Sequence, residues 1–129
     1  MLIRDVSRAG HELSRAEVDD LRGTMALGAV LAHRVRTEVA DYNQAPSALF
    51  TGLVQPVDAV RYSAGSRLRV PRTLDAERCV QAVEEAAAAG VLRVRVDGGE
   101  LIADLGQELE VEAVRELLVV LERPVVADV

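Results

Sequence analysis

The side chains that could act as a nucleophile, a base or a metal ligand are few and widely separated. His11 and His33 are the only imidazoles, and neither has a cysteine or a second histidine at the spacing of a metal site. Cys79 falls in an acidic segment, which disfavours the reactive thiolate. Glu84 and Glu85 point apart on a helix, since only residues three or four positions apart share a face. We therefore expect no enzymatic activity, no cofactor and no metal.

The clearest local pattern predicts a β-hairpin between residues 92 and 105. Apolar and polar residues alternate on both sides of the turn, as in half-buried strands. Asp97, Gly98 and Gly99 favour the positive φ angles of a tight turn. A free hairpin edge can accept an added strand or an acidic helix. The predicted partner-binding residues are Arg93, Arg95, Asp97, Gly98, Gly99 and Leu101.

A second candidate site is a basic run between residues 61 and 72. Its arginines are Arg61, Arg67, Arg69 and Arg72, and the nearest acids in sequence are Asp58 and Asp75. These arginines are possible contacts to an anionic partner. The alternative is a solvated loop that pairs with the acidic C-terminal half. The structure of residues 43–73 cannot be read from periodicity, and short strands or a short helix are both open.

A long helix is expected from a capping box at Ser14 and Glu17 to about Tyr42. Apolar and small residues recur along it at steps of three and four, which is typical of a helical packing seam. The seam residues are Leu21, Met25, Gly28, Ala32, Val35 and Val39. They pack either against the C-terminal unit or against a second copy in a dimer.

The C-terminal half predicts a helix, the hairpin and a last helix. The first helix is capped by Thr73 and closed by Gly90, and the last runs from about Glu108 to Glu122. The last helix is apolar on two sides, which favours a homodimer contact. The predicted fold class is α+β, a long N-terminal helix packed on a small helix–hairpin–helix (αββα) unit. Residues 1–73 form the helix with an irregular basic arm, and residues 74–129 form the recognition unit, in one shared core.

Composition narrows the function classes further. The chain has 129 residues, half of them hydrophobic, and its fifteen basic residues are all arginine. No apolar run approaches the length of a membrane span, and the start lacks a secretory signal. A single cysteine fits a reducing, cytoplasmic location.

Charge is unevenly distributed along the sequence. Residues 1–73 hold ten arginines against eight acids, whereas residues 74–129 hold five against thirteen. The acidic C-terminal half argues against nucleic acid as its partner, because phosphate is repelled.

One known family resembles part of this pattern. The run from Val80 to Leu101, followed by Leu109 and residues 114–121, is similar to the tubulysin-type docking domains of polyketide and nonribosomal peptide assembly lines. Those are small αββαα modules at subunit junctions. The resemblance implies a homodimer whose hairpin receives a short peptide from the preceding subunit. Gly90, Arg93, Arg95, the turn at residues 97–99 and Leu101 match the pattern.

These observations predict a non-enzymatic protein–protein interaction or docking module that binds a peptide at the hairpin edge. One alternative is a winged-helix-like DNA-binding protein with Arg67, Arg69 and Arg72 on phosphate. The expected recognition helix carries Asp75 and Glu77, which disfavours that reading. Another alternative is a structural subunit of a larger, phage-type assembly whose middle arm is ordered only on assembly.

Overall fold

The structure is a computed structural model that describes residues 1–62 and 65–129. Strands exceed helices in this part of the chain, and they form four sheets. The helices are α1 (Leu27–Gln44), α2 (Ala76–Ala88) and the short 3-10 helix η1 (Val111–Ala113). The strands are β1 (Leu2–Ser7), β2 (Glu12–Glu17), β3 (Thr24–Ala26), β4 (Leu49–Phe50), β5 (Val54–Pro56), β6 (Ala59–Tyr62), β7 (Gly65–Leu68), β8 (Leu92–Val96), β9 (Leu101–Ile102), β10 (Glu108–Glu110), β11 (Glu116–Leu121) and β12 (Val125–Ala127).

The largest sheet has the order β2-β1-β11-β8-β9 and joins the two ends of the chain. β1 runs parallel to β11, and the other neighbours are antiparallel. Ile3 lies beside Leu117, and Val119 lies beside Val94; all four are fully buried on one face. The alternating residues Arg4 and Leu118 are only partly buried on the other face. One face of this sheet therefore carries the core.

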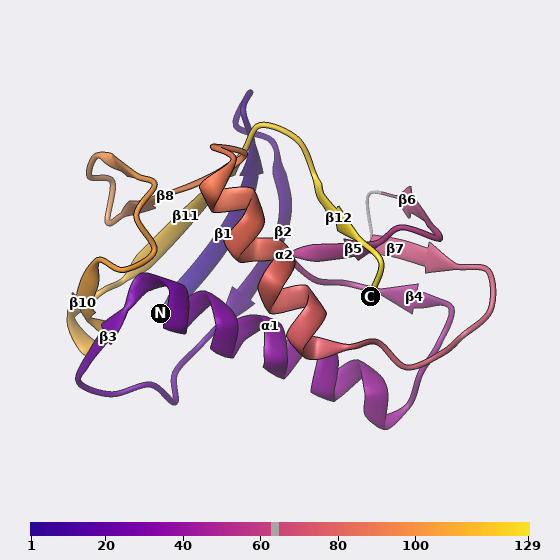
Figure 1. Ribbon diagram of the computed structural model, residues 1–129. Helices are drawn as coiled ribbons and strands as arrows, with labels where there is room; N and C mark the ends of the chain where they lie inside the picture. Colours follow the sequence, from indigo (N-terminus) through magenta and orange to yellow (C-terminus); the bar gives the residue numbers. More distant parts are fainter. Residues whose placement is uncertain (63–64) are drawn as a thin grey trace.

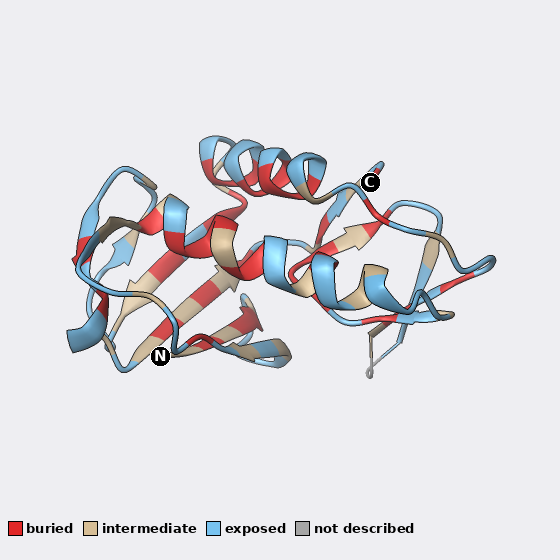
Figure 2. Cartoon of the chain, turned by 90° about the horizontal axis from the view of Figure 1, so that it is seen from below, coloured by how far each residue is buried: buried red, intermediate tan, exposed pale blue. Residues whose placement is uncertain are grey.

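Both helices lie on the buried side of this sheet (Figure 1). α1 places buried apolar residues at intervals of four positions, among them Leu27, Leu31 and Val35, so that one stripe faces inward. It ends before Pro46, where the Ala45 N–H donates to the Tyr42 carbonyl oxygen at 3.2 Å. α2 packs against α1 and against β8. In Figure 2 the buried residues lie where the helices and strands face one another.

The remaining short strands gather at the opposite end of the molecule from β3 and β10 (Figure 1). Three of them form a sheet of order β4-β7-β6, and β5 pairs with β12 in parallel. The C-terminal segment holds this end in place, since the Val57 N–H donates to the Ala127 carbonyl oxygen at 2.9 Å. Arg72 also donates to the Val129 carbonyl oxygen at 3.0 Å.

The prediction of a last helix over residues 108–122 is wrong, and the fold class is corrected with it. This segment forms β10, η1 and β11. Along β11 buried and half-buried residues alternate strictly, with Leu117, Val119 and Leu121 inward. A strand period of two places these residues on one face, and pairing with β1 on one side and β8 on the other settles the choice. The molecule is a mixed α/β protein rich in sheet, and it is not a long helix on an αββα unit.

The expected start of the first helix is also wrong. Ser14 and Glu17 belong to β2, and a further strand, β1, precedes the expected start of the helix. Gly23 has a φ of 74°, which interrupts any helix before Thr24. The helical spacing was misleading upstream of Leu27 because β2 pairs with β1 through contacts that local periodicity does not encode.

The hairpin and the helix before it do form, as β8, β9 and α2, although the return strand β9 ends at Ile102, short of the expected Leu105. Asp75, two residues after the expected cap, is the N-cap of α2 and accepts hydrogen bonds from the Glu77 and Arg78 N–H groups. Gly90, with a φ of 74°, follows the helix. The sheet crosses the expected boundary at residue 73, because β1 pairs directly with β11. Buried residues from both halves form one core.

Candidate functional site

The sheet β4-β7-β6 carries an exposed surface that combines apolar and basic side chains, here called the arginine face. It consists of Val60, Tyr62, Arg67, Arg69 and Val70. The ladder places Val60 beside Arg67, whereas Ser66 and Leu68 alternate with Arg67 and are buried beneath. The exposed fractions are 60% for Val60, 54% for Tyr62 and 67% for Val70. A shallow groove of about 630 Å³ runs over this face.

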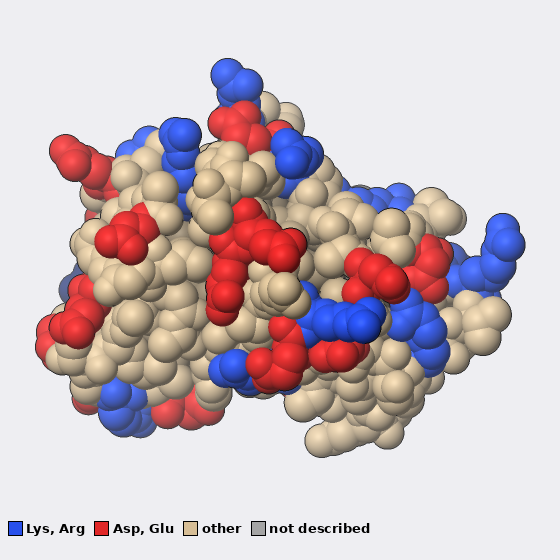
Figure 3. All heavy atoms as spheres, in the orientation of Figure 1, with Lys and Arg blue, Asp and Glu red and all other residues tan. Residues whose placement is uncertain are grey.

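Most of the arginines here lack a carboxylate partner. Arg72 binds Asp58 through Nη2 at 2.7 Å, so it is already used within the chain. Arg61, Arg67 and Arg69 form no ion pair with any residue of the described part of the chain. Figure 3 shows blue side chains at the end of the molecule that carries β6 and β7, while red side chains cross its middle. The arginine face therefore has positive charge available for an anionic partner.

The predicted hairpin site is present, but two of its polar side chains are used to hold the turn. Arg95 Nη1 donates to the Gly99 carbonyl oxygen at 2.8 Å. Asp97 Oδ1 accepts from the Arg115 and Glu116 N–H groups at 3.0 and 2.9 Å. These bonds join the turn to the start of β11.

The turn backbone has the expected left-handed angles, with a φ of 48° at Asp97 and 74° at Gly98. Arg93 is exposed, and Leu101 is 39% exposed. These two residues are the part of the predicted hairpin site whose side chains remain available to a partner.

The residues of the predicted seam pack against other parts of the same chain. Ala32, Val35 and Val39 are buried in the core. Gly28 lies against Leu105, where an added Cβ would come within 3.1 Å of the Leu105 Cβ. Leu21 and Met25 lie outside α1 and pack on the edge of the core. These contacts match the intramolecular alternative for the seam.

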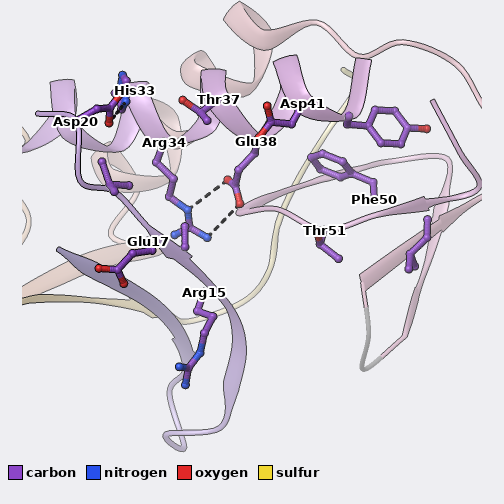
Figure 4. A pocket seen from close by; sticks show the side chains of 14 residues that line it. Arg15, Glu17, Asp20, His33, Arg34, Thr37, Glu38, Asp41, Phe50 and Thr51 are labelled. Carbon is purple, nitrogen blue, oxygen red and sulfur yellow. Dashed lines mark hydrogen bonds and ion pairs between the residues drawn. The ribbon is translucent and has the colours of Figure 1, made fainter. Parts of the chain in front are cut away.

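A cleft of about 450 Å³ opens between α1, β2 and β4. In Figure 4 Arg34 and Glu38 reach from α1 toward β2 and Thr51, whereas Arg15 points away from them. His33 lies at the rim, with Nε2 2.9 Å from Asp20 Oδ1. Sequence analysis placed no site here.

A buried ionic network forms the floor of this cleft. Arg34 donates through Nη1 and Nη2 to the two carboxylate oxygens of Asp5, both at 2.5 Å. Its Nε also lies 3.2 Å from Glu38 Oε1. The Ser14 hydroxyl donates to Asp5, and the Leu53 N–H donates to Glu38 Oε1 at 3.3 Å. The network ties α1 to β1, to β2 and to the segment before β5.

Burial and neighbouring charges shift the pKa values of this network in opposite directions. It raises the pKa of Glu38 above its usual value, although the charge of Arg34 opposes the rise. Burial by itself lowers the pKa of Arg34, but the hydrogen bonds and charge of Asp5 more than offset this, so that the pKa of Arg34 is raised. A carboxyl group with a raised pKa can act as a general acid. Here its bonds to Arg34 and Leu53 give it a structural role.

Sequence analysis missed Asp5, Arg34 and Glu38. A signal was present in α1, because Arg34 stands between Leu31 and Val35 on the apolar side of the helix. A charged residue in that position needs an opposite charge when buried. The partner on β1 is far away in sequence, so the pair itself could not be read from the chain.

Two further searches of the described residues are negative. In residues 1–62 and 65–129, no three His, Cys, Asp or Glu side chains converge closely enough to hold a metal ion. Neither α1 nor α2 has the length and apolar composition needed to cross a membrane.

Comparison with protein-family models, with curated proteins and with solved structures gave no match to this chain.

Proposed function

We propose that this chain is a non-enzymatic protein-interaction domain whose arginine face binds an acidic and partly apolar segment of another protein. The observation that carries the proposal is the coincidence of exposed apolar residues and unpaired arginines on one small sheet. Single exposed valines are ordinary on protein surfaces, but a cluster marks an interaction site. Within the described part of the chain, five of the seven large apolar residues that are exposed lie between residues 49 and 70.

The energetics of this face support a protein partner. Complete burial of an exposed valine side chain contributes about 1.5–3 kcal/mol. Val60, Tyr62 and Val70 are all more than half exposed. Arg67 and Arg69 stand beside them, so that a partner carrying both carboxylates and apolar side chains would satisfy the whole face. Aromatic residues and arginine are also the types that contribute most in protein interfaces.

Nucleic acid is the second candidate, and the same arginines suggest it. Phosphate binding needs several cations that are free to release counterions. Arg72, one of the three arginines expected on phosphate, is paired with Asp58. The apolar side chains between the arginines gain nothing from phosphate. The net charge of the chain is −6, which adds long-range repulsion.

The test uses a fluorescently labelled peptide of alternating glutamate and valine, titrated with the protein and followed by anisotropy. We expect saturable binding that Arg67→Glu weakens by about tenfold or more, since it replaces an attraction by a repulsion. Arg93→Glu is the matched control on the hairpin, where the same charge change should leave the affinity unaltered.

Each other outcome has a defined meaning. If only Arg93→Glu weakens binding, the hairpin is the site and the arginine face is not. If neither variant matters, or the peptide does not bind, the proposal fails. Tighter, salt-sensitive binding of a labelled DNA duplex than of the peptide would favour the nucleic-acid candidate.

We also propose a cytoplasmic location, and the oligomeric state is a separate question that a mass measurement answers. The support for this location is that Cys79, the single cysteine of the sequence, is a free and buried thiol, so that the fold does not depend on an internal disulfide. The expected dimer contact was the apolar last helix, and that segment forms β11 in the centre of a sheet. Light scattering at several concentrations gives the mass in solution.

A further inference from the structure

We propose that the partner adds to the edge of β6 as an extended strand with alternating acidic and apolar residues. This inference rests on the proposed function and adds that the partner contacts both faces of β6, the apolar residues of the arginine face and Arg61 on the opposite face. Three observations support it, namely a free strand edge, the alternation of side chains along β6 and the charge that surrounds them.

The edge of β6 is free in the described part of the chain. The sheet order β4-β7-β6 places β6 at one side, paired only with β7. In an antiparallel ladder, every second residue of an edge strand directs its N–H and C=O away from its neighbour. β6 spans four residues, whereas β9 and β2, at the two edges of the larger sheet, span two and six. β2 is longer, but it begins with Glu12 and ends with Glu17. These carboxylates repel an acidic strand, so β6 is the edge that suits one.

Side-chain alternation along β6 predicts the composition of the added strand. Val60 lies in register with Arg67 on the arginine face. Arg61 points to the other face, since it pairs with the buried Ser66. There it lines a second cleft of about 270 Å³ together with Ser14 of β2. A neighbouring strand places its own side chains opposite these. On the arginine face, apolar residues of the partner would lie beside Val60 and Tyr62, with Arg67 of β7 one strand further in. On the opposite face, carboxylates of the partner would lie beside Arg61.

Charge excludes a second copy of this chain as the preferred occupant. Pairing of two β6 edges about a twofold axis would bring Arg61 of each copy close to the shared edge, with Arg67 of β7 one strand further away. Like charges that face each other across a ladder are destabilising. Arg61 forms no ion pair with any residue of the described part of the chain. The positive charge at the edge of β6 attracts an acidic strand instead. A partner with glutamate or aspartate at alternate positions therefore fits best.

The experiment compares the glutamate–valine peptide with two matched forms, one N-methylated at every valine and the other at every glutamate. In an added strand, all residues of one type direct their N–H groups toward β6 and the others direct them to solvent. We expect one methylated form to bind about tenfold or more weakly and the other to change by less than about threefold. We also expect slower hydrogen exchange at the β6 amides in the complex.

Equal affinity of the unmodified peptide and both methylated forms would overturn strand addition while leaving the proposed function intact. Equal weakening of both methylated forms, or unchanged exchange at the β6 amides, would also overturn it. If the unmodified peptide does not bind, both the inference and the proposed function fail.

A charge swap provides an independent readout. Arg61→Glu should weaken binding of the glutamate–valine peptide and strengthen binding of a lysine–valine peptide. Arg61 is exposed, so the substitution should not disturb folding. If the lysine peptide gains nothing from the swap, Arg61 does not face the partner and the assigned register is wrong.

Discussion

Replacing Arg34 by methionine should destabilise the protein strongly, because it removes the cation at the centre of a buried ionic network. The side chains of Arg34 and Asp5 are each 1% exposed, and that of Glu38 is 16% exposed. Methionine retains much of the apolar stem of arginine, so the packing of α1 on the sheet is largely kept. The carboxylates of Asp5 and Glu38 are then left together in the interior without the positive charge of Arg34.

The size of the effect follows from this geometry. Arg34 makes two hydrogen bonds to Asp5 and lies against Glu38. Removing one partner of a buried ion pair costs about 3–5 kcal/mol, since the remaining charge is neither solvated nor paired. A domain of this size has a total stability of about 5–15 kcal/mol. The variant should therefore lose at least about a fifth of its free energy of unfolding.

The assay is urea unfolding followed by circular dichroism at neutral pH, with the free energy obtained by linear extrapolation. Arg36→Met is the matched control, because Arg36 lies on the same helix and pairs with Glu77 at 2.8 Å in an exposed position. Exposed pairs contribute little, so this control should unfold almost as the wild type does. If Arg34→Met loses no more stability than Arg36→Met, the network does not hold α1 on the sheet.

A double variant tests whether unpaired buried charge is the cause of the lost stability. Asp5→Asn combined with Arg34→Met removes the cation and one of the stranded charges together. It should be more stable than Arg34→Met alone, although it has lost more of the native hydrogen bonds. An additive loss from the two substitutions would contradict the electrostatic explanation.

Three further predictions concern other parts of the structure. Glu38 has a pKa raised above 4.5 in the folded protein, so the stability that its protonated form contributes is present below about pH 4.5 and is lost as the pH rises through the raised pKa. In urea titrations between about pH 4 and pH 8, Glu38→Gln should therefore show a smaller loss of stability with rising pH than the wild type. The same pH profile for both proteins would refute the raised pKa of Glu38. Gly65→Ala should destabilise the protein by about 1–3 kcal/mol in thermal melts, since Gly65 has a φ of 138° and an added Cβ would come within 2.6 Å of the Phe50 carbonyl oxygen. Gly98→Ala is the control for a positive φ alone, because an added Cβ there meets no atom within 4 Å. Cys79 is fully buried with a pKa of about 12, so a thiol reagent should modify it only after unfolding; rapid labelling of the native protein would contradict its burial.

Local patterns predicted the elements whose residues interact with near neighbours in sequence. The helix at residues 76–88 has its cap, its apolar stripe and its closing glycine within a few turns. The hairpin at residues 92–102 has its turn residues and its alternation together. The helix and the hairpin turn are confirmed because the decisive contacts lie within the segment itself, whereas the cap is Asp75 rather than Thr73 and the return strand ends at Ile102 rather than Leu105.

The candidate site could be predicted only in part. The arginines at positions 61, 67 and 69 are visible in the sequence, and so is their distance from acids. Their placement beside Val60 and Tyr62 on a single face required the pairing of β6 with β7, which sets which residues alternate outward. The network of Asp5, Arg34 and Glu38 required a helix to lie over a strand from another part of the chain.

Sequence by itself determined the hairpin turn at residues 97–99, which residues are apolar and how charge is distributed between its halves, since these depend on residue types and near neighbours. Only the tertiary structure decided that residues 116–121 form a strand. Their apolar residues suit either a helix or a strand. Pairing with β1, more than a hundred residues earlier, supplies the hydrogen bonds that favour the strand. The same long-range pairing decides which arginines face outward, and hence where a partner can bind.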